Sequence, residues 1–206
     1  MRKFFAAMLA VFFVAYLAIN NQNAQRKFLY PFPYRDKVER HAARYKVDKF
    51  LAVSVMKVES NFAKDAMSRS GAIGLMQIMP ETAAWIACCL DDDPPSLDEL
   101  HDSDKNIRYG IWYLSELEYE FGGNDVLALA AYNAGRGNVN HWIEKNGWSK
   151  DFSDVDAIPF DETRKYVKRV LECKEKYSAL YGAANVASKP VEPKELRFAS
   201  LRFFYD

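Results

Sequence analysis

Residues 50–60 read FLAVSVMKVES, an almost continuous apolar run that ends with a carboxylate, Glu59, and a hydroxyl, Ser60. The run is apolar nearly all round, so we expect it to be buried. Its β-branched residues would also suit a buried strand, and periodicity alone does not separate the two structures. Asp48, which precedes the run, is a suitable N-cap if the segment is a helix.

Glu59 is the unusual residue of this segment. A carboxylate in a buried segment loses its hydration, which costs free energy unless the group is paired or protonated. One interpretation is a glutamate at a helix end whose side chain points into water. The other is a buried carboxyl with a raised pKa, which a general acid needs near neutral pH and which glycosidic bond cleavage requires.

The surrounding chain predicts one all-α domain over residues 34–182, because apolar residues recur at spacings of three and four. Asn124 and Asp161 are expected N-caps. The acidic, proline-containing residues 91–99 are expected to form a loop. We find no two-residue alternation typical of a strand and no internal repeat. The expected helices cover residues 34–45, a segment opened by Pro80, 107–121, a segment from Asn124 to Ala131, 137–145 and a segment from Asp161 to about Tyr181.

The N-terminus predicts a targeting segment over residues 1–20. Arg2 and Lys3 precede an uninterrupted apolar run from Phe4 to Ile19. As a helix this run would span about 24 Å, slightly less than a bilayer core of about 30 Å. We favour an uncleaved signal anchor, since small residues are missing at the positions that cleavage requires; a removed signal peptide is the alternative. A helix buried in the domain is a third interpretation.

Either targeting interpretation places the remaining chain outside the cytoplasm, anchored in the cytoplasmic membrane or secreted to the periplasm. Residues 21–33 are polar, then aromatic and proline-containing, and are expected to be a linker. Residues 183–206 form a C-terminal tail to which the sequence assigns no role. The sequence predicts no oligomeric state.

Composition excludes several classes of function. Acidic and basic residues balance at 28 each, so no strong field is available to collect nucleic acid. Three cysteines, Cys88, Cys89 and Cys173, are too few for a disulfide framework, although one bridge from Cys173 stays open. The scattered histidines match no metal-ligand spacing, and no phosphate-binding loop or nucleophile elbow is present. We therefore expect neither a metal nor a cofactor.

Two further stretches are unusual: GAIGLMQIMP at 71–80 and LAAYNAGRGNVN at 129–140. Their glycines allow a backbone to approach another group closely. Their amide and phenol groups can hydrogen-bond to sugar hydroxyls and acetamides. Each stretch alone is a weak signal, because glycine beside asparagine usually means a turn.

Four short motifs occur together and in order: ESNF at 59–62, GLMQIMP at 74–80, AYNAG at 131–135 and ETRKYV at 162–167. In this order they resemble the catalytic domain of the soluble lytic transglycosylases, over residues 36–181. The resemblance implies an all-α, lysozyme-like fold with a substrate groove, and therefore a helix for residues 48–59. It implies peptidoglycan glycan strands as the substrate.

Carried over residue by residue, Glu59 resembles the family's catalytic glutamate. Ser68 matches a serine that contacts the substrate acetamide, and Ser60 is expected to cap or pack. For Met76 and Met79, core packing is an equally good interpretation. The residues implied to bind substrate are Ser68, Met76, Gln77, Met79, Tyr132, Asn133, Glu162 and Tyr166.

The resemblance implies a lyase. Glu59 would protonate the oxygen of the β-1,4 bond between N-acetylmuramic acid and N-acetylglucosamine, then accept the proton of the muramoyl C6 hydroxyl, which closes on C1. An ordinary glycosidase needs a second carboxylate about 5–10 Å away. The acidic run Asp91 to Asp93 is better interpreted as a solvated loop. The alternatives are a goose-type-lysozyme-like hydrolase and an inactive peptidoglycan-binding scaffold.

Overall fold

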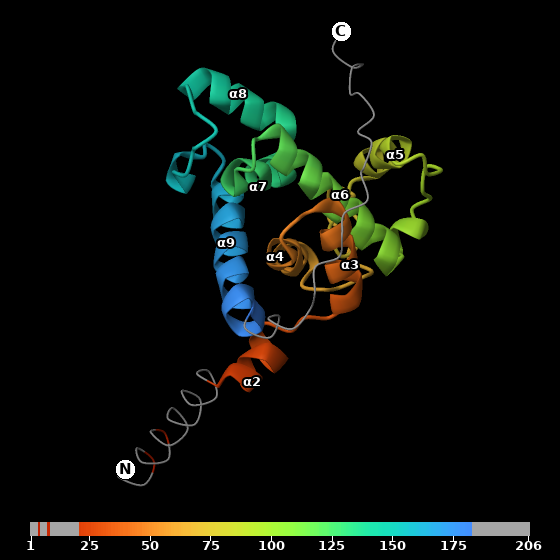
Figure 1. Ribbon diagram of the computed structural model, residues 1–206, viewed down its shortest axis with the longest axis vertical. Coiled ribbons are helices and arrows are strands. Elements are labelled where there is room, and N and C mark those ends of the chain that lie inside the picture. Colours follow the sequence, from red (N-terminus) through yellow and green to blue (C-terminus); the bar gives the residue numbers. More distant parts are fainter. Residues whose placement is uncertain (1–3, 5–7, 9–20, 183–206) are drawn as a thin grey trace.

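The computed structural model describes Phe4, Met8 and residues 21–182 (Figure 1). In this part the chain forms helices and turns, and its only extended pairings are two isolated bridges, Met67 to Ile73 and Ile73 to Ile78. The expected all-α fold is therefore confirmed for these residues. The expected targeting segment, residues 1–20, lies outside them except for Phe4 and Met8, and so does the tail, residues 183–206.

The domain is built mainly of α-helices, and residues 61–79 form a long connection between two of them. Three short elements of other types interrupt the order: the π-helix η1 (Gln25–Leu29) and the 3-10 helices η2 (Glu99–His101) and η3 (Val155–Ala157). The α-helices are α2 (Gln22–Ala24), α3 (Arg35–Tyr45), α4 (Lys49–Ser60), α5 (Pro80–Cys89), α6 (Ser103–Glu120), α7 (Asp125–Ala134), α8 (Arg136–Asn146) and α9 (Asp161–Tyr181).

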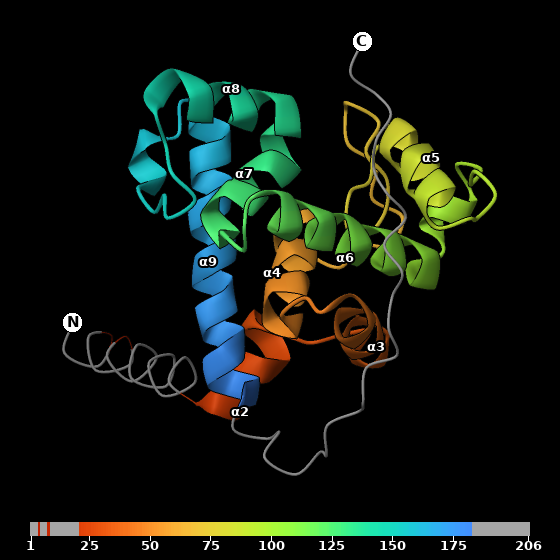
Figure 2. The same cartoon turned by 45° about the horizontal axis from the view of Figure 1, so that its top comes forward.

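Helix α4 is the centre of this arrangement. It lies between α3 and α9, and α6 runs across it (Figures 1 and 2). Residues 51–56 are all buried, so neighbours cover every side of the helix. Asp48 caps its start as expected, accepting a hydrogen bond from the Phe50 amide at 2.8 Å. The apolar run that left helix and strand undecided is therefore a helix wrapped by other helices.

The long helices follow the predicted apolar stripes, and two boundaries differ. Helix α6 starts at Ser103, before the predicted residue 107, because Asp102 caps it by accepting from the amides of Asp104 and Lys105. Helix α7 is capped by Asn124 as predicted but continues beyond Ala131 to Ala134. Its extra residues matter for the site, because they bring AYNAG into the last turn of a helix.

The predicted cap of α9 was wrong. Phe160 is the N-cap residue, without a side-chain hydrogen bond, and Asp161 is the first helical residue. The Asp161 carboxylate pairs instead with Arg164 at 3.3 Å and Lys165 at 2.6 Å. It still stabilises the helix start, since a negative charge in the first turn interacts favourably with the helix dipole.

The loop between α4 and α5 is fixed to α6 by one buried amide. The Asn106 side chain donates to the carbonyls of Ile73 and Leu100 at 2.9 and 2.8 Å and accepts from the Met76 amide at 2.8 Å. Gly74, with φ +79°, makes this possible: a Cβ there would lie 2.4 Å from the Asn106 amide nitrogen. The GLMQIMP stretch is thereby held in one conformation against the core.

Residues 21–33, expected as a linker, lie against the C-terminal end of α9. Arg26 donates to the Leu180 carbonyl at 2.9 Å, and the Tyr181 hydroxyl donates to the Tyr30 carbonyl at 2.9 Å. The Tyr177 hydroxyl donates to the carbonyl of Pro31 at 2.7 Å. These contacts tie the segment to the domain. No helix in the described part has both the length and the hydrophobicity needed to cross a membrane.

We predict that Asn106→Ala lowers the free energy of unfolding by about 2–4 kcal/mol, because it leaves the buried Met76 amide and two carbonyls without their partner. Urea-induced unfolding followed by circular dichroism measures this change. The matched control is Asn138→Ala, at an exposed amide that bonds only to the Ala134 carbonyl, and it should change stability by less than about 0.5 kcal/mol. Equal unfolding midpoints for the two variants would contradict the proposed anchoring.

Candidate active site

The C-terminal end of α4 opens into a cavity of about 490 Å³. Glu59 is half-buried at its wall and is the only acidic residue of the described chain that lines it. Of the other residues expected at the site, Ser68 and Gln77 also line this cavity. The structure thus brings Glu59, Ser68 and Gln77 together at one cavity. The lining residues are Lys57, Val58, Glu59, Ser60, Asn61, Ala66, Met67, Ser68, Gln77, Arg169 and Cys173.

Burial raises the pKa of the Glu59 carboxyl from 4.5 to about 7, and Tyr166 opposes that rise. Desolvation acts on the charged form, so a carboxyl without a cationic partner keeps its proton to higher pH. A pKa near 7 lets one group give up and take back a proton in neutral solution. Glu59 therefore has the acidity of a general acid and base.

Two tyrosines surround the carboxyl. Burial and the nearby Glu59 charge raise the pKa of Tyr132 and of Tyr166 well above 10, so both hydroxyls stay protonated. The Tyr132 hydroxyl donates to the Met76 carbonyl at 2.8 Å. The Tyr166 hydroxyl is buried beside Glu59 but makes no hydrogen bond of regular geometry with any described residue. Its interaction with Glu59 nevertheless lowers the pKa of that carboxyl, so this hydroxyl is a donor available to the acid.

Ser60 holds the end of α4 to the loop that carries Gln77. Its hydroxyl donates to the Leu75 carbonyl at 2.8 Å and accepts from the Phe62 amide at 3.1 Å. The Gln77 side-chain amide donates to the Gly74 carbonyl at 2.9 Å, and the Gln77 backbone has a φ of +47°. The Ser68 hydroxyl accepts from the Ala72 amide at 2.9 Å. These local bonds place polar side chains around the Glu59 carboxyl.

Six of the expected site residues do not line the cavity: Tyr132 and Tyr166 beside Glu59, and Met76, Met79, Asn133 and Glu162. Met76 is fully buried, and a Cβ on Gly110 of α6 would lie 2.6 Å from it, so its side chain belongs to the core. Met79 is half-buried as the N-cap residue of α5. Asn133 accepts a hydrogen bond from Thr163 at 2.8 Å and joins α7 to α9, whereas Glu162 is exposed on α9.

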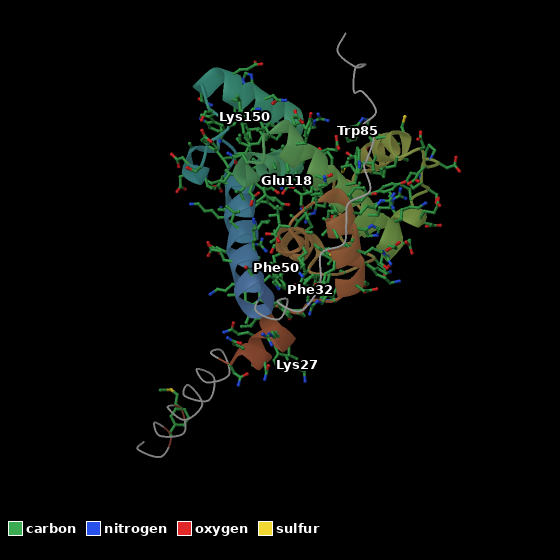
Figure 3. All side chains as sticks on the ribbon, viewed as in Figure 1. Lys27, Phe32, Phe50, Trp85, Glu118 and Lys150 are labelled. Atoms are coloured by element: carbon green, nitrogen blue, oxygen red, sulfur yellow. The ribbon has the colours of Figure 1, made fainter. Side chains whose placement is uncertain are left out.

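A row of half-buried aromatic rings leads away from Tyr132. Tyr113 of α6 lies 5.4 Å from Tyr132 between ring centroids, and Trp85 of α5 lies 6.1 Å from Tyr113. Trp85 extends from α5 (Figure 3), and the Arg136 guanidinium lies 5.6 Å from its ring centroid. Aromatic faces of this kind can stack on apolar faces of sugar rings.

Sequence reasoning missed Lys57, Arg169 and Cys173, which line the cavity with Glu59. For Arg169 and Cys173 the sequence does contain a signal, their spacing from Tyr166. Tyr166, Arg169 and Cys173 are three and four residues apart, which places them on one face of a helix. Lys57 lies two residues before Glu59 and gives no comparable signal, because its place depends on how α9 packs against α4.

The acidic run at residues 91–93 does not supply a second carboxyl. Asp92 pairs with Arg108 at 2.8 Å and accepts from the Tyr109 hydroxyl at 3.0 Å. None of the three aspartates lines the cavity around Glu59. Asp92 therefore has a structural role, as an anchor between the loop and α6.

Comparisons with known proteins agree with this geometry. Residues 36–155 match the Transglycosylase SLT domain family. The chain is 36% identical over 154 residues to the soluble lytic murein transglycosylase of Escherichia coli (strain K12), covering 74% of this chain and 23% of that protein. It is 32% identical over 165 residues to the membrane-bound lytic murein transglycosylase C of Yersinia pestis (strain Pestoides F), covering 70% of this chain and 46% of that protein.

Solved structures show the same fold. An inactive mutant of the lytic transglycosylase Slt from Pseudomonas aeruginosa superposes with a TM-score of 0.69 at 36% identity, covering 78% of this chain and 27% of that one. The 70 kDa soluble lytic transglycosylase of Escherichia coli gives a TM-score of 0.70 at 32% identity, covering 82% of this chain and 30% of that one.

The chain therefore spans less than half the length of these relatives. The expected lysozyme-like architecture of the family is nevertheless confirmed over the described helices. The family match covers the GLMQIMP and AYNAG motifs and Glu59, and Glu59 and Gln77 line one cavity. On this combination of sequence, fold and site, the chain belongs to the transglycosylase SLT domain family.

Proposed function

We propose that this protein is a peptidoglycan lytic transglycosylase that cleaves the β-1,4 bond between N-acetylmuramic acid and N-acetylglucosamine. The observation that carries the proposal is a lone carboxyl, Glu59, with a pKa of about 7 in a cavity that no other acidic side chain of the described residues lines. A hydrolase of the usual kind needs two carboxyl groups. A single one fits a reaction whose nucleophile belongs to the substrate.

In the proposed mechanism, protonated Glu59 donates its proton to the glycosidic oxygen as the bond to C1 breaks. The resulting carboxylate then accepts the proton of the muramoyl C6 hydroxyl, whose oxygen bonds to C1. The products are a free N-acetylglucosamine hydroxyl and a 1,6-anhydromuramoyl end. Glu59 regains its proton, and no water is consumed.

Tyr166 and Tyr132 are assigned to the environment of the acid. Tyr166 places a buried, protonated hydroxyl beside Glu59, where it can stabilise the carboxylate formed after proton donation. Tyr132 is bonded to the Met76 carbonyl and ties α7 to the loop that carries Gln77. Ser68 and Gln77 offer hydrogen bonds to the acetamide and hydroxyls of the sugar. We assign Met79, Asn133 and Glu162 to more distant parts of the groove.

The proposed domain organisation is a signal anchor or signal peptide over residues 1–20, a connecting segment over 21–33, the catalytic domain over 34–182 and a tail over 183–206. An enzyme that cuts peptidoglycan must act outside the cytoplasm. The protein would then be held at the membrane by its N-terminus, or be secreted to the periplasm if that segment is removed. Membrane-bound and soluble relatives both support this proposal.

We predict that digestion of peptidoglycan in ¹⁸O-labelled water gives 1,6-anhydro ends without label, because the C6 hydroxyl replaces water as the nucleophile. Mass spectrometry of the released fragments measures both features. Reducing ends that carry ¹⁸O would show a hydrolase of the goose-lysozyme kind instead. The absence of both kinds of new end would indicate a binding scaffold.

Glu59→Gln should lower kcat by at least about a hundredfold, since it removes the proton donor and keeps the size and polarity of the side chain. The control is Glu118→Gln, because burial raises the pKa of Glu118 to about 7 as well, at a separate cavity of α6. That control should keep full activity. Equal rates for Glu59→Gln and the parent would remove the catalytic assignment.

Glu59→Gln should also stabilise the fold above neutral pH. The folded-state pKa of Glu59 is raised, so folded protein holds this proton more tightly, and stability falls as pH rises from about 4.5 to about 7. The gain from the substitution is therefore close to zero at pH 4 and about 1–2 kcal/mol at pH 8, after discounting for the half-exposed side chain. Urea unfolding at both pH values measures it; an equal effect at both would contradict the raised pKa.

Tyr166→Phe should move the alkaline limb of the kcat/KM profile to higher pH, because Tyr166 lowers the pKa of Glu59 in the parent. In the parent that limb is expected near pH 7, where the acid loses its proton. The exposed Tyr119→Phe and the Glu118→Gln variants should both keep the parent limb. If the limb shifts in Glu118→Gln and stays unchanged in Tyr166→Phe, the titrating group is Glu118 and not Glu59.

A further inference from the structure

The cavity that holds Glu59 also contains two positive charges that the proposed chemistry does not use. Lys57 of α4 and Arg169 of α9 both line it, on helices that pack side by side. Neither is among the residues that sequence reasoning assigned to the site. Because a glycosidic bond is neutral, cations at this position need a separate explanation.

Neither cation is neutralised within the described part of the chain. Neighbouring lysines on the same helices are paired: Lys49 with Glu39, Lys168 with Asp156 and Lys174 with Asp125. Lys57 and Arg169, by contrast, form no ion pair with a described residue. Unpaired cations are common on a fully solvated surface, so the relevant point is their convergence in one cavity.

Lys57 is held in position by aromatic rings. Its ammonium lies 5.5 Å from the ring centroid of Tyr30 and 5.8 Å from that of Phe62, on opposite flanking segments of α4. A cation between two rings is stabilised by both, and it loses less freedom when it binds an anion. The segment that contains Tyr30 thereby contacts a lysine that lines the cavity.

Lys57 and Arg169 both act electrostatically on the thiol of Cys173. Burial raises the pKa of the Cys173 thiol, and both cations act against that rise, so both lie near this one sulfur. Glu172 acts on the same thiol with the opposite sign, but it is exposed and does not line the cavity. The pKa of Glu59, in contrast, is set by burial and Tyr166. Lys57 and Arg169 are therefore not among the groups that set the pKa of Glu59, although they share its cavity.

We infer that Lys57 and Arg169 form an anion subsite that binds a carboxylate carried by the muramoyl sugar. This inference rests on the proposed function. N-acetylmuramic acid bears a lactyl group on C3, whose carboxyl is either free or linked to a peptide with carboxylates of its own. N-acetylglucosamine bears no such group. A cation pair beside the acid therefore selects which sugar lies on which side of the cleaved bond.

The test compares the parent with the double variant Lys57→Gln/Arg169→Gln on three soluble substrates. The first is glycan strands with intact peptides, and the second is strands freed of peptide by an amidase, which carry the lactyl carboxylate. The third is the same freed strands with that carboxylate converted to a methylamide. The control variant is Lys176→Gln, at an exposed lysine of α9 outside the cavity.

The double variant should raise KM about fivefold to tenfold on carboxylate-bearing strands with kcat within about twofold, as expected when binding is lost equally in ground and transition states. A KM rise on freed strands would identify the lactyl carboxylate as the group that the subsite binds. A KM rise confined to intact strands would identify a carboxylate of the peptide. On the methylamide the parent and the variant should have equal KM values. The KM advantage of the parent should also shrink with added salt.

Two results would overturn the inference. One is an unchanged KM on both carboxylate-bearing substrates, and the other is an equal rise on the methylamide, which would show a structural effect instead of charge recognition. Lys57→Arg/Arg169→Lys, which keeps both charges, should retain most of the parent KM. The proposed function fails separately, if the parent itself produces no anhydro ends.

Discussion

The burial of α4 on every side is the constraint on which the rest of the structure depends. Because residues 51–56 are all covered, α3 and α9 pack against one helix, and its charged side chains appear only where that cover ends. Glu59 lies at this end. The same packing that forms the core therefore removes water from one carboxyl and raises its pKa to about 7.

Much of the helical framework could be predicted from sequence, because apolar spacing and caps are local signals. The stripe of α9 and the cap residues Asp48 and Asn124 were correctly identified. The cap at Asp161 was not, since an aspartate serves equally well as the first helical residue or as its cap. The apolar run of α4 was ambiguous for a physical reason: a segment buried all round has no exposed face to give it a period.

The candidate site was predictable to the extent that it depends on motifs. Glu59, Ser68 and Gln77 share one cavity, as the resemblance implied. Met76 shows the limit of such reasoning: the methionine itself packs on Gly110, and only its backbone carbonyl serves the site through Tyr132. Lys57 was missed because the contact between α4 and α9 is long-range, and local spacing carries no information about it. Arg169 shares a helix face with Tyr166, a local signal that was available.

The proposed role of Glu59 as a general acid limits where a cation can lie in this cavity. A cation in contact with the carboxyl would stabilise its charged form and lower its pKa, so the proton would be lost in neutral solution. A substrate with a carboxylate nevertheless needs a positive partner within the same cavity. Lys57 and Arg169 line the cavity near Cys173, which follows Tyr166 along α9. Cations at this position could bind a carboxylate of the substrate without lowering the pKa of Glu59. Tyr166, whose hydroxyl stays protonated beside the acid, can assist the carboxylate without holding it ionised.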